Sequence, residues 1–73
     1  MPNNNFRKVN DLADEIKYLH ENGDPKTAFR QALRPWSRLT KLVKEAPDNE
    51  QPVLHHIMVE TEKLLDEMKR RAK

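Results

Sequence analysis

Apolar side chains recur at steps of three and four residues along three stretches of the chain, a spacing that places them on one face of an α-helix. The stretches span residues 6–22, 25–46 and 52–71. None shows the alternation that marks a half-buried β-strand. The pattern therefore predicts an all-α fold, a small bundle of three to four helices with a long C-terminal helix. The apolar positions of the outer stretches are Phe6, Val9, Leu12, Ala13, Ile16 and Leu19, then Leu54, Ile57, Met58, Thr61, Leu64, Leu65, Met68 and Ala72.

Glycine and proline residues mark the joints between these stretches. We expect Gly23 to end the first helix in the left-handed backbone conformation that glycine commonly supplies there. Asp24 and Pro25 are typical of a helix start, because aspartate accepts hydrogen bonds from the free amides and proline fits the first turn. The segment from Pro47 to Pro52 encloses four polar residues and predicts a turn.

Pro35 lies in the middle of the second stretch, where it removes one backbone hydrogen bond and disfavours helical geometry at Arg34. The helical phase of the apolar residues nevertheless continues across it. We therefore predict a kinked or closely jointed pair of helices, over residues 25–34 and 35–46, that share one apolar face. Trp36 falls on that face and is expected in the core. The predicted face comprises Phe29, Ala32, Leu33, Trp36, Leu39, Thr40 and Val43.

The chain has 73 residues, which suffices for one domain. We expect residues 1–5 to form a disordered N-terminal tail and residues 6–73 to form a single helical domain. The absence of cysteine excludes a disulfide framework, and the single glycine excludes a glycine-rich phosphate loop. The apolar runs are too short for a membrane span or a signal-peptide core, so the cytoplasm is the expected location.

Charge is unevenly distributed along the chain, although the formal net charge is only +2. Residues 1–24 carry five acidic and three basic side chains, and residues 45–73 carry seven acidic and five basic ones, so each segment has a net charge of −2. Residues 25–44 carry six basic side chains and no acidic one. Such an unmixed positive block favours binding to phosphates or to acidic protein surfaces. Its members are Lys26, Arg30, Arg34, Arg38, Lys41 and Lys44.

On a helix these basic side chains lie opposite the apolar ones, in a row about 20 Å long at about 1.5 Å per residue. We expect this row to bind a partner, with support from the basic C-terminal end. The alternative, an ordinary solvated face of an amphipathic helix, stays open. The predicted partner-binding residues are Arg30, Arg34, Arg38, Lys41, Lys44, Lys69, Arg70 and Arg71.

No combination of residues predicts catalysis. Ser37 is the only serine and has no histidine near it in the sequence. His56 and Glu60 are four residues apart and could share a metal ion with His20 from another helix, but zinc requires a closed set of three or four ligands and nothing else supports one. We therefore expect a protein that is not an enzyme and has no cofactor or metal.

In size, charge and helical make-up, the whole chain resembles small bacteriophage-encoded regulators that bind host RNA polymerase and change its promoter use. Those regulators are non-catalytic and act by occupying a surface. The resemblance lies in the character of the chain and not in a motif, so no functional residue is carried over. It implies a subunit of bacterial RNA polymerase as the partner, in the cytoplasm of the host, and modulation of transcription by steric occupation.

Two other functions remain open at this point. The basic face of residues 26–44 could bind nucleic acid directly, although the segment has few Asn, Gln or Ser side chains to read base edges. The apolar stripe of the last helix could instead project and join two copies of the chain in a homodimer.

Overall fold

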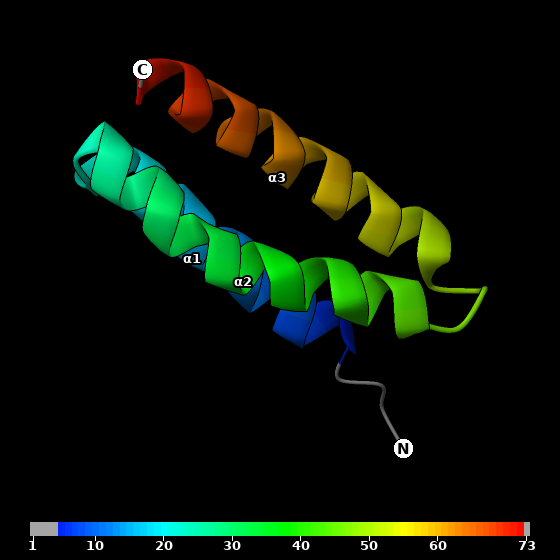
Figure 1. Cartoon of the computed structure of the whole chain (residues 1–73). Coiled ribbons are helices and arrows are strands. Elements are labelled where there is room, and N and C mark those ends of the chain that lie inside the picture. The colour runs from blue at the N-terminus through cyan, green and yellow to red at the C-terminus, as the bar shows by residue number, and fades with distance from the viewer. Residues whose placement is uncertain (1–4, 73) are drawn as a thin grey trace.

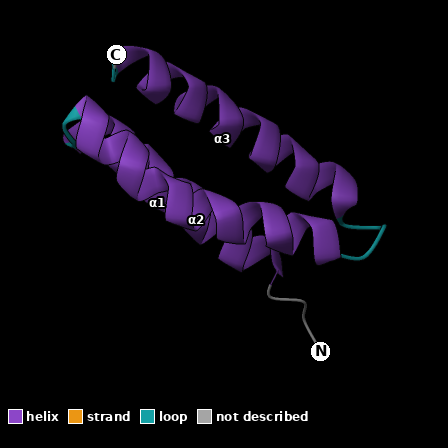
Figure 2. Ribbon diagram, viewed as in Figure 1, coloured by secondary structure: helices purple, strands orange, loops and turns teal. Residues whose placement is uncertain are grey.

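The computed structural model describes residues 5–72, which form three helices and no strand. Helix α1 spans Asn5–Asn22, α2 spans Pro25–Glu45 and α3 spans Gln51–Arg71. They run up, down and up in a rod of 42 × 17 × 15 Å, with α1 and α2 side by side and α3 along both (Figures 1 and 2). The predicted all-α bundle is confirmed. Residues 1–4 of the expected tail lie outside the described residues, and Asn5 already belongs to α1.

Gly23 and Asp24 form the tight joint between α1 and α2. The expected left-handed conformation of Gly23 is wrong, because its φ angle is not positive. Close approach explains the glycine instead, since a Cβ atom there would lie 2.8 Å from the Leu19 carbonyl oxygen and 3.0 Å from the Ala28 Cβ. Asp24 caps α2 as predicted, and its carboxylate accepts hydrogen bonds from the backbone N–H and the hydroxyl of Thr27 at 3.3 and 3.4 Å.

Helix α2 is continuous across Pro35, so the predicted division into helices 25–34 and 35–46 is wrong. Proline removes only the one hydrogen bond that its own nitrogen would donate to the Gln31 carbonyl. The buried residues before and after it, Ala32 and Leu39, lie on the same side of the helix as the buried Pro35 ring. Both halves of α2 therefore pack on one common seam.

Gln51 connects α2 to α3 at the other end of the rod. Its side-chain amide donates to the Val43 carbonyl at 2.6 Å and to the Ala46 carbonyl at 2.9 Å. Carbonyls in the last turn of a helix lack intrahelical donors, and the Gln51 amide supplies hydrogen-bond donors to the carbonyls at the end of α2. The N-cap of α3 is Glu50, whose side chain does not cap the free backbone N–H groups of the helix.

The core consists of two clusters of buried side chains along the rod, and the half-buried Trp36 packs against both, in agreement with its predicted place. The cluster near the α2–α3 turn contains Val9, Leu39, Val43, Ala46 and Leu54. The cluster near the α1–α2 joint contains Ile16, Ala28, Ala32, Leu65 and Met68.

The buried stripe of α2 is rotated relative to the predicted apolar face. Leu33 was expected inside but is 46% exposed, whereas Ala28 and Pro35 are buried. Leu33 lies about 120° around the helical wheel from the buried Leu39, at the edge of the predicted face, so the rotation brings it to the surface. Phe6, on the predicted face of α1, is likewise 50% exposed.

Helix α3 is no longer than α2, since each has 21 residues. Its apolar stripe faces its own chain: Leu54 belongs to one core cluster and Leu65 and Met68 to the other. The stripe therefore packs on α1 and α2 and does not project from the bundle. Within residues 5–72, no helix is both long enough and apolar enough to cross a membrane.

Candidate docking face on helix α2

The five predicted binding residues of α2 form a single row on the outside of the rod. All are exposed, and on a helical wheel of about 100° per residue they fall within a sector of about 120°, opposite the buried Ala32 and Leu39. We call these five residues the basic row: Arg30, Arg34, Arg38, Lys41 and Lys44. Over the 14 residues from Arg30 to Lys44, a rise of about 1.5 Å per residue gives a length of about 21 Å.

No carboxylate in residues 5–72 lies within ion-pair distance of the basic row. The ion pairs of this part of the chain all include a residue of α3, and none includes one of α2. Exposed and unpaired cations keep their charge available to a ligand, and together they attract anionic surfaces over a distance of about 10 Å at moderate salt.

The basic residues at the end of α3 do not form one surface with the basic row. Lys69, Arg70 and Arg71 are consecutive, so their side chains point about 100° apart around the helix. Arg71 is already engaged, since its Nη2 lies 2.8 Å from Oε1 of Glu67. Because α3 runs antiparallel to α2, this end of the rod lies beside the start of α2 and is remote from Lys44 (Figure 1). Only the residues on α2 are therefore brought together.

Beside the basic row, a groove runs between α1 and α2, and sequence reasoning did not find it. It consists of two adjacent hollows of about 420 and 400 Å³ that share Leu12 and Arg38. No residue of α3 lines either hollow. We call this feature the α1/α2 groove; its lining is Lys8, Asp11, Leu12, Glu15, Leu19, Gln31, Arg34, Pro35, Arg38, Lys41, Leu42 and Glu45.

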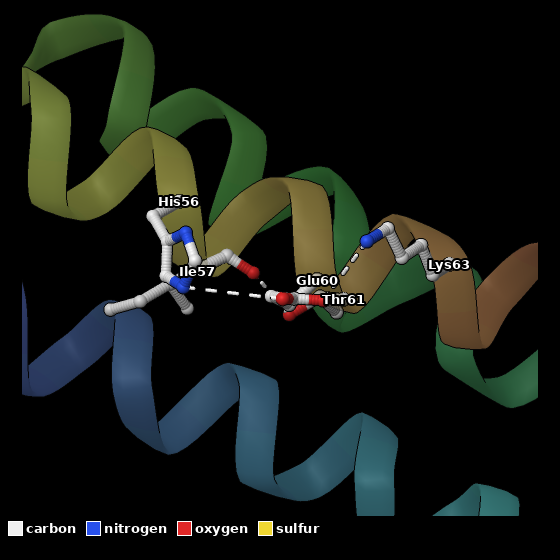
Figure 3. A network of polar contacts seen from close by, with 5 residues as sticks. All are labelled: His56, Ile57, Glu60, Thr61 and Lys63. Atoms are coloured by element: carbon white, nitrogen blue, oxygen red, sulfur yellow. Dashed lines mark hydrogen bonds and ion pairs between the residues drawn. The ribbon is translucent and has the colours of Figure 1, made fainter.

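The histidines do not converge. His56 Nε2 lies 4.0 Å from Glu60 Oε1, and Lys63 Nζ lies 3.5 Å from Oε2 of the same glutamate, on the exposed side of α3 (Figure 3). His20 lies at the other end of the bundle, where its Nε2 is 3.3 Å from Glu67 Oε1 without hydrogen-bond geometry. Across residues 5–72, no group of three or more His, Asp or Glu side chains is placed to hold a metal ion.

Comparison with known proteins adds no assignment to this geometry. No protein-family model, no curated protein and no solved structure matches the chain.

Proposed function

We propose that the chain is a non-catalytic docking protein whose basic row binds an acidic surface of a larger macromolecular assembly. The observation that supports this is the row itself: five exposed cations on one helix face, with no carboxylate of residues 5–72 within ion-pair distance. An ordinary solvated helix face mixes both signs of charge and forms ion pairs four residues apart. The resemblance of the whole chain to phage regulators makes bacterial RNA polymerase the leading partner, in the host cytoplasm. Binding then modulates transcription by covering a surface.

The test is capture of purified bacterial RNA polymerase after nuclease treatment, on immobilised protein. The variant Arg34→Glu, Arg38→Glu, Lys41→Glu reverses the centre of the basic row. Because all three side chains are exposed, helicity should be unchanged while capture is lost. The matched control is Arg7→Glu, Lys17→Glu, Lys63→Glu, which changes the net charge equally on α1 and α3 and should retain capture. Equal capture by both variants, with intact helicity, would contradict the proposal.

Direct binding of nucleic acid is the second candidate function. It is supported by the ladder of Arg30, Arg34 and Arg38, whose steps of four residues place guanidinium groups at intervals of about 6 Å along the helix. Such a ladder can follow phosphates, and its affinity would fall steeply as salt is raised. An anisotropy titration of a labelled oligonucleotide at about 50 mM salt distinguishes the two, since no binding there removes this candidate.

A further inference from the structure

The α1/α2 groove combines apolar side chains with members of the basic row, whereas the hollows between α1 and α3 are lined by none of that row. Its floor is apolar, formed by the half-buried Leu12, Leu19 and Leu42 and the buried ring of Pro35. A surface that only attracts polyanions has no need of this apolar floor. Three members of the basic row also line it, so the cations and the leucines form one continuous surface.

The two walls of the groove carry opposite charge. The α2 wall presents Arg34, Arg38 and Lys41 together with Glu45, so its net charge is positive. The α1 wall presents Asp11 and Glu15 together with Lys8, so its net charge is negative. Phosphates approaching the groove would meet these carboxylates, which disfavours a nucleic-acid strand there. A ligand whose acidic groups lie only along the edge that faces α2 would pair with the cations of α2 and would keep its acidic groups away from the carboxylates of α1.

The dimensions suit an α-helix. Lining residues on α2 run from Gln31 to Glu45, a rise of about 21 Å, which corresponds to about four helical turns. A surface made by two packed helices readily accepts a third helix along its groove, as α3 shows on the other side of α1 and α2 (Figure 1). An amphipathic helix of this length presents apolar residues at i, i+3, i+4 and i+7 to such a groove.

We propose that the α1/α2 groove binds a helix of the partner protein, with an apolar stripe on the leucine floor and an acidic edge along Arg34, Arg38 and Lys41. This inference rests on the proposed function, because it makes the basic row one wall of the binding site. A second copy of this chain does not supply the helix, since the stripes of its described helices are buried in its own core clusters.

The experiment uses two synthetic helical peptides of about 20 residues with identical charges, glutamate along one edge and lysine along the other. One peptide carries a leucine stripe, and in the other serine replaces each leucine. We expect the wild-type protein to bind the leucine peptide at least about tenfold more tightly, because only leucine gains from the apolar floor. Equal affinities, or no binding of the leucine peptide, would overturn the proposal.

Two variants of the basic row separate groove binding from simple charge attraction. Arg38 lines both hollows of the groove, whereas Lys44 lies in the same row but lines neither. Arg38→Glu should weaken binding of the leucine peptide at least about tenfold, and by a larger factor than Lys44→Glu. The control Lys63→Glu, on α3 and outside both the basic row and the groove, should change it less than about twofold. If both variants weaken RNA polymerase capture equally and the protein shows no peptide preference, the basic row docks without the groove. The inference then fails while the proposed function stands.

Methyl NMR provides a readout that needs no variant in the groove. Adding the leucine peptide should shift the methyl signals of Leu12, Leu19 and Leu42, and leave those of Val53 and Leu64, which line hollows between α1 and α3, unchanged. Shifts confined to Val53 and Leu64 would place the peptide in the wrong groove and overturn the proposal. Light scattering of the mixture distinguishes a one-to-one complex from assembly of several copies of the chain, and the second outcome also counts against it.

Discussion

Gly23 lies where the end of α1 comes closest to the start of α2. A methyl group there would lie 2.8 Å from the backbone carbonyl of Leu19, which cannot move without disturbing the last turn of α1. We therefore expect Gly23→Ala to lower the free energy of unfolding by about 1–3 kcal/mol, the usual cost of overpacking. Urea denaturation followed by circular dichroism measures this change.

The exposed Ser37 on α2 provides the control, since Ser37→Ala should change stability by less than about 0.5 kcal/mol. Where a glycine is unstrained and has room, replacement by alanine stabilises a protein by about 0.4–1 kcal/mol. A gain of that size for Gly23→Ala would show that the two helices do not constrain this position.

Gln51 stabilises the joint between α2 and α3. Its amide donates two hydrogen bonds to the end of α2, each contributing about 0.5–1.5 kcal/mol. Gln51→Ala should therefore lower the free energy of unfolding by about 1–3 kcal/mol. Gln31→Ala on the exposed side of α2 is the matched control, with an expected change below about 0.5 kcal/mol. Equal effects of the two substitutions would mean that the bonds of Gln51 add nothing to stability.

Gly23 and Gln51 also show which contacts at the joints cannot be predicted from local sequence patterns. The cap at Asp24 was predicted correctly, because capping depends on residues three positions apart in the chain. The role of Gly23 was predicted wrongly, since its constraint is the space left between the Leu19 carbonyl of α1 and Ala28 of α2, and not a positive φ angle. The hydrogen bonds of Gln51 to the end of α2 were not predicted, because they depend on how the turn between α2 and α3 folds back.

Helix α2 is the element on which sequence and structure differ most. Proline in a helix interior is less favourable than alanine by about 3 kcal/mol, whereas replacing the buried ring with a methyl group removes about two methylenes, at about 0.8 kcal/mol each. We therefore expect Pro35→Ala to raise the free energy of unfolding by about 1 kcal/mol. Thermal and urea denaturation of the two proteins would measure the change.

The control for this substitution is Pro25→Ala, at the first residue of the same helix. Proline is well tolerated there because an N–H group at this position would have no intrahelical acceptor. We therefore expect no comparable gain in the free energy of unfolding. A loss of stability above about 1 kcal/mol for Pro35→Ala would show that the buried ring contributes more than the missing hydrogen bond costs.

The periodicity of apolar residues located the helices, but not the angle at which α2 faces its neighbours. The predicted apolar face omitted Leu42, which lines the α1/α2 groove, and included Leu33, which is exposed. A helical wheel treats one helix at a time, whereas the buried sector of α2 is set by contact with both α1 and α3. The basic row was predictable because steps of three and four residues place its members on one face of a helix whatever the angle of that helix to its neighbours.

At the scale of the whole molecule, the described residues 5–72 contain few large side chains that are fully buried. They are Val9, Ile16, Leu39, Leu54 and Met68. A chain of 73 residues has a typical stability of about 4–11 kcal/mol at about 0.05–0.15 kcal/mol per residue. Truncating one buried leucine to alanine costs about 2–5 kcal/mol, which is a large part of that total.

Replacing Leu39 and Leu33 by alanine, one at a time, tests this estimate with the same substitution at two positions of α2. Leu39 is fully buried in the cluster near the α2–α3 turn, and Leu33 is 46% exposed. We expect Leu39→Ala to lower the free energy of unfolding by about 2–5 kcal/mol, while Leu33→Ala changes it by less than about 1 kcal/mol. The helical circular dichroism signal at 25 °C and its urea midpoint measure both. Similar losses for the two variants would mean that Leu33 is covered in solution by something other than the described part of this chain.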